Sequence, residues 1–182
     1  HTRQVSPFIF ETLFTFGEGF EVIPQMVDTY TMSDDGLVYN LVLRKNIKFH
    51  DGSDFTAEDV IASLERFKTT VQYGAKLDAV TAMEIVNDYE VKITLDKPIG
   101  LLPALAFPQR PVMMPKEVAE RNMGTELKGA DIVGSGPYKL LEWVPDVHIK
   151  LERFDDYALD DRMEEASGLG GKRIAYFKTV YL

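Results

Sequence analysis

Alternating apolar and polar positions mark the strands that this sequence predicts. Residues 37–44 are rich in β-branched and aromatic side chains, and Tyr39, Leu41 and Leu43 fall on one face of the expected strand. The same alternation continues through residues 89–95, which follow a turn at residues 87–88 and a shorter apolar run at 83–86. We therefore expect a half-buried β-hairpin over residues 83–95.

Helical spacing of apolar residues is clearest between residues 57 and 70. Val60, Leu64 and Phe67 recur at intervals of three or four, which predicts an amphipathic helix. Thr56 stands at the N-cap position, and Asp59, three residues later, completes an acidic form of the capping box. A similar spacing of apolar residues over residues 5–16 predicts another short helix.

Shorter segments complete the predicted arrangement. We expect helices at 101–107 and 116–123, a short strand at 47–49, an extended proline-rich loop at 108–115, a hairpin at 138–153 and a final strand at 174–182. Residues 155–165 hold six acidic residues and one basic residue, and three glycines follow, so 155–172 is predicted to be a mobile surface loop. The expected fold class is α+β, with a mixed, mostly antiparallel sheet and flanking helices.

Composition narrows the classes of function. The chain has 182 residues, a net charge of −9 and no cysteine. Nucleic-acid and anionic-lipid partners are disfavoured because both need an excess of basic residues on one face. Disulfides and thiolate sites are excluded by the missing cysteine.

The sequence offers little that favours catalysis. His1, His50 and His148 do not have the spacing of metal ligands, so no metal or other cofactor is expected. Gly134-Ser135-Gly136 resembles half of a nucleophile elbow, but Pro137 is unsuited to the helix that such an elbow requires. The adjacent acids at 155–165 are expected to be solvated. We expect a protein that is not an enzyme.

One long motif resembles a known family. Residues 39–60 run from Tyr39-x-Leu41-x-Leu43-Arg44 through Phe49-His50-Asp51-Gly52 to Thr56-Ala57-Glu58-Asp59-Val60, and they resemble the signature of family 5 extracellular solute-binding proteins. Shorter stretches resemble the same family in the same order. They are Phe10-Glu11-x-Leu13, Pro24-Gln25-Met26-Val27, Leu95-Asp96-Lys97-Pro98, Gly134-Ser135-Gly136-Pro137-Tyr138 and Arg153-Phe154-Asp155-Asp156-Tyr157. Ala158 stands where this family usually has tryptophan.

The resemblance implies part of a periplasmic-binding-protein type II fold, in which two lobes close on a ligand. It assigns residues 1–10 and 135–182 to lobe one, and residues 11–134 to a domain inserted in that lobe. The second ligand lobe would then be absent from the chain, and we expect a fragment of a longer receptor.

The family also implies a function. Its members are extracytoplasmic receptors of ABC importers, so the expected partners are a peptide or similar small solute and the membrane permease subunits. The expected location is the periplasm, or a lipid-anchored extracytoplasmic position. A nickel chelate, haem, an opine or an oligosaccharide remains open as the ligand. A hydrolase and a stand-alone interaction domain are the alternatives from other classes.

Four residues are candidate ligand contacts. Phe107 and Arg110 lie in the proline-rich loop, and Arg110 can pair with a ligand carboxylate. Gly134 and Ser135 lie in the tight loop before the 138–153 hairpin. The alternative for Arg110 is a surface arginine held between prolines, and for Gly134 and Ser135 it is turn geometry alone.

Overall fold

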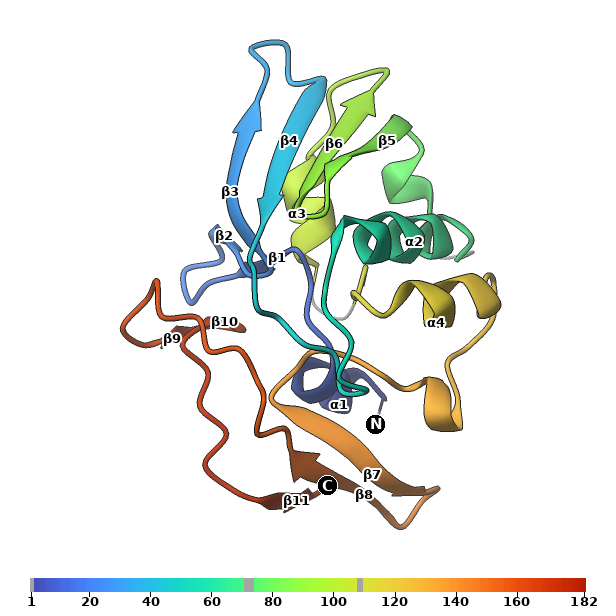
Figure 1. Cartoon of the computed structure of the whole chain (residues 1–182), viewed down its shortest axis with the longest axis vertical. Helices are drawn as coiled ribbons and strands as arrows, with labels where there is room; N and C mark the ends of the chain where they lie inside the picture. Colours follow the sequence, from blue (N-terminus) through green and yellow to red (C-terminus); the bar gives the residue numbers. More distant parts are fainter. Residues whose placement is uncertain (1, 71–73, 108–109) are drawn as a thin grey trace.

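A four-stranded antiparallel sheet organises the upper half of the molecule in the computed structural model, which describes residues 2–70, 74–107 and 110–182 (Figure 1). Its strand order is β3-β4-β6-β5. These strands are β3 (Val27–Met32), β4 (Val38–Leu43), β5 (Val80–Asn87) and β6 (Glu90–Leu95). The predicted strand at 37–44 and the predicted hairpin are confirmed.

The alternation in the sequence decides which face of this sheet is buried. Tyr39 and Leu41 of β4 lie opposite Ile93 and Val91 of β6, and all four side chains are buried. Because side chains alternate across a strand, the polar residues between them face the other side. Each buried pair therefore reinforces the register of the two central strands.

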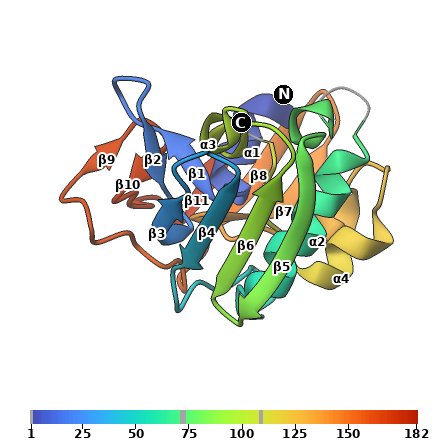
Figure 2. The same cartoon turned by 90° about the horizontal axis from the view of Figure 1, so that it is seen from above.

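Helix α2 (Ala57–Lys68) packs near β5 and β6 and beside the short helix α4 (Lys116–Arg121) (Figures 1 and 2). Another short helix, α3 (Leu101–Ala106), contacts residues 14–16 and 22–24. The predicted cap is present, since the Asp59 carboxylate accepts the Thr56 backbone N–H at 2.8 Å and the Thr56 hydroxyl at 3.0 Å. The same carboxylate accepts the Lys116 backbone N–H at 2.8 Å and so joins α2 to α4. Burial raises the pKa of Asp59.

The main core lies between this sheet and α2. The rings of Phe49 and Phe55 meet edge to face with centroids 5.9 Å apart, and both side chains are fully buried. Val60 and Leu64 of α2 join the same cluster. Two single-turn 3-10 helices at Gly74–Leu77 and Gly129–Asp131 complete the helical elements of the described chain. The segment predicted as a strand at 47–49 forms only an isolated bridge between Lys48 and Asp54.

A second, three-stranded antiparallel sheet forms the lower half, with the order β11-β8-β7 (Figure 1). Its strands are β7 (Tyr138–Val144), β8 (His148–Arg153) and β11 (Thr179–Tyr181), which confirms the predicted hairpin. Helix α1 (Thr2–Ile9) contacts β7. Val5 and Ile9 of α1 join Tyr138, Ile149 and Leu151 in a core separate from the main one.

The helix predicted over residues 5–16 is shorter than expected. It ends at Ile9, and strand β1 (Phe14–Phe16) pairs with β2 (Val22–Pro24). The Leu13 carbonyl accepts the backbone N–H groups of Gln25 and Met26 at 3.0 and 3.2 Å. Contacts with the 22–26 segment therefore override the local helical spacing of the apolar residues.

The acidic segment predicted as a surface loop at 155–172 is largely exposed, as expected, but Asp160 departs from the prediction because it is only 3% exposed. Arg162 donates to Asp160 at 2.7 Å and to the Val27 carbonyl at 2.7 Å, and Arg44 donates to the Leu159 carbonyl at 2.9 Å. Burial alone would raise the pKa of Asp160, but the two arginines hold it below its usual value. The segment is thus fastened to the start of β3.

Two further features complete the described chain. Strands β9 (Ala166–Ser167) and β10 (Gly170–Gly171) form a minimal hairpin beside β1 and β2 (Figure 1). In the proline-rich loop, residues 108–109 lie outside the described residues, so the predicted extended conformation is not assessed there.

Candidate functional site

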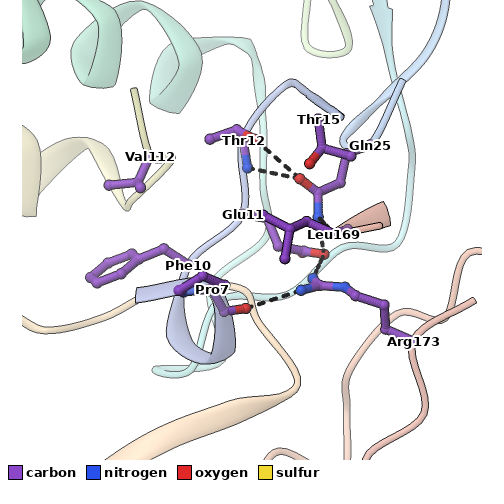
Figure 3. Close-up of a pocket in the computed structure, with 9 residues that line it drawn as sticks. All are labelled: Pro7, Phe10, Glu11, Thr12, Thr15, Gln25, Val112, Leu169 and Arg173. Carbon is purple, nitrogen blue, oxygen red and sulfur yellow. Dashed lines mark hydrogen bonds and ion pairs between the residues drawn. The ribbon is translucent and has the colours of Figure 1, made fainter. Parts of the chain in front are cut away.

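A buried carboxylate joins four distant parts of the chain. Glu11, just after α1, is 3% exposed, and its two oxygens accept hydrogen bonds from four side chains. Oε1 accepts from Arg173 Nη2 at 2.6 Å, Tyr157 Oη at 2.9 Å and Gln25 Nε2 at 3.3 Å, while Oε2 accepts from Ser135 Oγ at 3.0 Å. We call these five residues the Glu11 network; Figure 3 shows Glu11, Gln25 and Arg173 converging.

Charge balance holds this network together. The guanidinium of Arg173 also donates to the Pro7 carbonyl at 3.0 Å, at the end of α1. Burial alone would lower the pKa of Arg173, but the Glu11 carboxylate and Tyr157 raise it overall. Burial, followed by the negative charge of Glu11, raises the pKa of the Tyr157 hydroxyl. Tyr157 is therefore a fixed neutral donor.

The cavity beside the network is too small for a solute. Its volume is about 20 Å³, and Glu11, Gln25 and Arg173 contribute to its walls (Figure 3). A single water molecule needs roughly 10–15 Å³, whereas small-molecule sites usually span about 300–1,000 Å³. The network therefore fastens chain segments together and does not itself enclose a ligand.

The network fixes the tight loop that contains Gly134 and Ser135. Ser135 is 1% exposed, and its hydroxyl donates to Glu11. His50 holds the loop from the other side, because its Nε2 lies 2.9 Å from the Gly136 carbonyl and its backbone N–H donates to the Gly134 carbonyl at 2.9 Å. The Gly134 N–H points to His50 Nδ1 at 3.4 Å, so the ring is the neutral Nε2–H tautomer.

We predict that His50 makes stability depend on pH. Burial lowers the pKa of His50, although the Gly136 hydrogen bond and the charges of Glu11 and Asp51 oppose that effect; Lys139 adds to it. A histidine whose folded-state pKa is depressed destabilises the fold as it becomes protonated. The free energy of unfolding should therefore fall as the pH drops below about 6.5 toward the folded-state pKa.

The control for this prediction is His50→Gln, which keeps an amide donor and acceptor but does not titrate. Urea unfolding between pH 8 and pH 5 should show a smaller decline in this variant than in the wild type. If the free energy of unfolding declines equally with pH in the two proteins, His50 does not carry the effect.

The other two candidate residues, Phe107 and Arg110, lie in a different environment. The side chain of Phe107 is 42% exposed, and the Lys76 ammonium lies 4.2 Å from the centre of its ring. Arg110 is exposed, and its positive charge contributes to lowering the pKa of Arg66 behind the effect of burial. Gly134 and Ser135 are buried, whereas Phe107 and Arg110 are accessible to a solute.

The chemistry available at these residues is binding and positioning. Ser135 donates to a carboxylate, and both ring nitrogens of His50 are engaged by backbone groups, so the two do not form a nucleophile–base pair. Residues 2–70, 74–107 and 110–182 contain no group of three or more His, Cys, Asp or Glu side chains suited to a metal ion. Within the same residues, no helix has the length and apolar character needed to cross a bilayer.

Sequence reasoning did not assign a role to Glu11, Gln25, Tyr157 or Arg173. Three of these lie inside short motifs that carried the family resemblance, as does Ser135. The available signal was the position of Glu11 beside Phe10 and Leu13. A carboxylate in such an apolar segment needs a hydrogen-bonding or charged partner if the segment is buried. Its partner Arg173 is 162 positions away, which local patterns do not reveal.

Solved structures similar to this chain include bacterial proteins in complex with bound ligands. NikZ from Campylobacter jejuni, in complex with Ni(L-His), aligns with a TM-score of 0.76 and 32% identity over 85% of this chain and 31% of its own. The ABC transporter-associated periplasmic binding protein DppA from Helicobacter pylori, in complex with the peptide STSA, aligns with a TM-score of 0.69 and 29% identity, over 82% and 34%. The fold therefore places the chain among bacterial solute-binding proteins.

The sequence comparison defines the family. The model of bacterial extracellular solute-binding proteins, family 5 Middle, matches residues 21–181, and the chain belongs to this family. The glutathione-binding protein GsiB of Salmonella paratyphi A is 31% identical over 160 residues, which are 86% of this chain and 31% of that protein. The chain spans about a third of the length of the curated relatives it matches.

Proposed function

We propose that this chain forms part of one wall of a receptor that captures a peptide or similar small solute and delivers it to an ABC permease. The observation that carries the proposal is the family 5 match over residues 21–181. The Glu11 network supports it, because a rigid wall lowers the entropic cost of closing on a ligand.

The proposed domain organisation assigns the two largest of the three apolar clusters in the described residues to different domains. Residues 1–10 and 135–182 belong to lobe one, around the core of Val5, Ile9 and Leu151. Residues 11–134 form the inserted domain around the main core. A second lobe that completes the cleft is part of the proposal, in keeping with relatives about three times as long.

The proposed ligand contacts are Phe107, Arg110, Gly134 and Ser135. Phe107 and Arg110 contribute accessible apolar and cationic groups. Gly134 and Ser135 contribute the shape of the wall, since the Ser135 hydroxyl is already bonded to Glu11.

A peptide is the favoured ligand class. Relatives are named for glutathione or hold a peptide or a nickel–histidine complex, and each of these ligands carries carboxylate groups. Arg110 can bind such a carboxylate through its fork of N–H donors. A nickel chelate, haem, an opine or an oligosaccharide is the alternative within the same family. We propose a periplasmic or lipid-anchored extracytoplasmic location, and binding without chemical conversion.

The proposal is tested by native mass spectrometry of the natural protein that contains this sequence. Native spectra should show about one solute per chain, and peptides recovered after incubation should be intact. Turnover of a chromogenic ester or peptide, abolished by Ser135→Ala, would establish the hydrolase alternative and overturn the proposal.

A further inference from the structure

An open groove runs along α2. It lies between α2, the edge strand β5 and α4, which are neighbours in both views (Figures 1 and 2). Its volume is about 520 Å³. The residues that line it are Glu58, Ile61, Ala62, Glu65, Ile85, Lys116, Glu120 and Met123.

Two helices present matching stripes to this groove. The α2 residues 58, 61, 62 and 65 recur at intervals that place them on one helix face. The residues from α4 and its C-terminal end, 116, 120 and 123, have the same kind of spacing. The α2 stripe is about 10 Å long, which equals two turns of a helix laid along it.

The centre of the groove is apolar and accessible. Ile85 on β5 is 47% exposed and Met123 is 43% exposed, and the half-buried Ile61 and Ala62 line the same groove. Exposed apolar side chains gathered in one hollow favour contact with another apolar surface. The unbranched Met123 side chain can adapt its shape to such a surface.

The rim of the groove is acidic. Glu58, Glu65 and Glu120 line it with a single lysine, Lys116, which pairs with Glu58 at 3.3 Å, and Lys68, outside the lining, pairs with Glu65 at 3.7 Å. The hydrogen bond and charge of Glu58 raise the pKa of Lys116, with smaller contributions from Glu120 and Glu117. A partner that carries positive charge around an apolar stripe is complementary to this arrangement.

We propose that this groove docks a basic amphipathic helix of a partner protein. Leucine-type side chains of that helix would cover Ile85 and Met123, and its lysines or arginines would face Glu65 and Glu120. A second copy of this chain fits less well, since the protein carries a net charge of −9 and like charges would meet at the rim. The inference does not depend on the solute proposed above.

Fluorescence anisotropy with a synthetic helix tests the proposal. The probe is a peptide of about 14 residues made of leucine and lysine, with the leucines on one face. We expect saturable binding that weakens about tenfold in Met123→Ser, which removes an apolar contact. The triple variant Glu58→Gln, Glu65→Gln, Glu120→Gln should also bind about tenfold more weakly, with less dependence on salt.

A matched triple variant separates docking from general attraction to an acidic protein. Glu18→Gln, Glu126→Gln, Glu164→Gln makes the same change in charge at exposed positions outside the groove. It should bind the probe within about twofold of the wild type. Circular dichroism spectra and thermal melts establish that each variant is folded.

Three outcomes would overturn the proposal. Equal weakening in both triple variants would show general charge attraction, and equal binding of a leucine–glutamate helix would show that the rim does not select cations. A concentration-dependent dimer that Met123→Ser converts to a monomer would assign the groove to a second copy. None of these readouts depends on solute binding, so the two proposals can fail separately.

Discussion

Replacing Glu11 with alanine should lower the free energy of unfolding by about 3–5 kcal/mol. The carboxylate neutralises Arg173 at 2.6 Å, and its removal leaves that guanidinium charged and largely buried. Tyr157, Gln25 and Ser135 lose an acceptor in the same step. Removing one member of a buried pair is costly because the remaining charge has lost the solvation of water.

Urea unfolding, followed by circular dichroism and by the fluorescence of the single tryptophan, Trp143, measures this loss. The exposed Glu142, paired with His148 on the surface of the lower sheet, provides the control. Glu142→Ala should change stability by less than about 1 kcal/mol. The double variant Glu11→Leu, Arg173→Met should recover much of the loss, since it removes both charges together.

A loss below about 1 kcal/mol in Glu11→Ala would contradict the role of the network. It would mean that water or a rearrangement of Arg173 replaces the carboxylate at little cost. The fastening of the Ser135 loop would then have another origin.

Replacing Gly134 with alanine should cost about 2–3 kcal/mol. A Cβ atom at this position would lie 2.1 Å from the Ile9 carbonyl oxygen and 2.8 Å from a ring carbon of Phe10. The loop cannot move aside freely, because the carbonyl of Gly134 accepts the backbone N–H of His50 at 2.9 Å. The close approach of two backbone segments therefore requires glycine.

Gly100→Ala is the matched control for this prediction. Gly100 has φ −73° and its nearest neighbour to a Cβ is 3.8 Å away, so alanine fits without a clash. Thermal melts should show a clearly lower midpoint for Gly134→Ala, whereas Gly100→Ala should stay close to the wild type. Equal melting midpoints in the two variants would show that the end of α1 and the loop at Gly134 can move apart at no cost in stability.

Local patterns predicted much of the upper half of the molecule. The alternation in β4 and β6 and the spacing of Val60 and Leu64 in α2 gave the correct elements, because each reflects contact with one core. The capping role of Asp59 was also visible, but its bond to the Lys116 N–H, which joins two helices, was not.

Long-range contacts account for what the sequence did not reveal. Leu13 and Phe16 continue a helical pattern, yet pairing of residues 14–16 with residues 22–24 makes that segment a strand. Asp160 belongs to an acidic run, and only the approach of Arg44 and Arg162 explains its burial. The candidate site is limited in the same way. The turn at residues 134–137 predicted Ser135 as a candidate, but its hydrogen-bond partner Glu11 lies 124 positions away in the chain.

Calorimetric titration tests the proposed receptor function most directly. The longest natural polypeptide that carries this sequence should be titrated with a short peptide, glutathione and a nickel–histidine complex. We expect saturable binding of at least one of them, with about one site per chain, and weaker binding of a carboxylate ligand to Arg110→Ala. Folded protein that binds none of the three, nor any other small solute offered to it, would contradict the proposal.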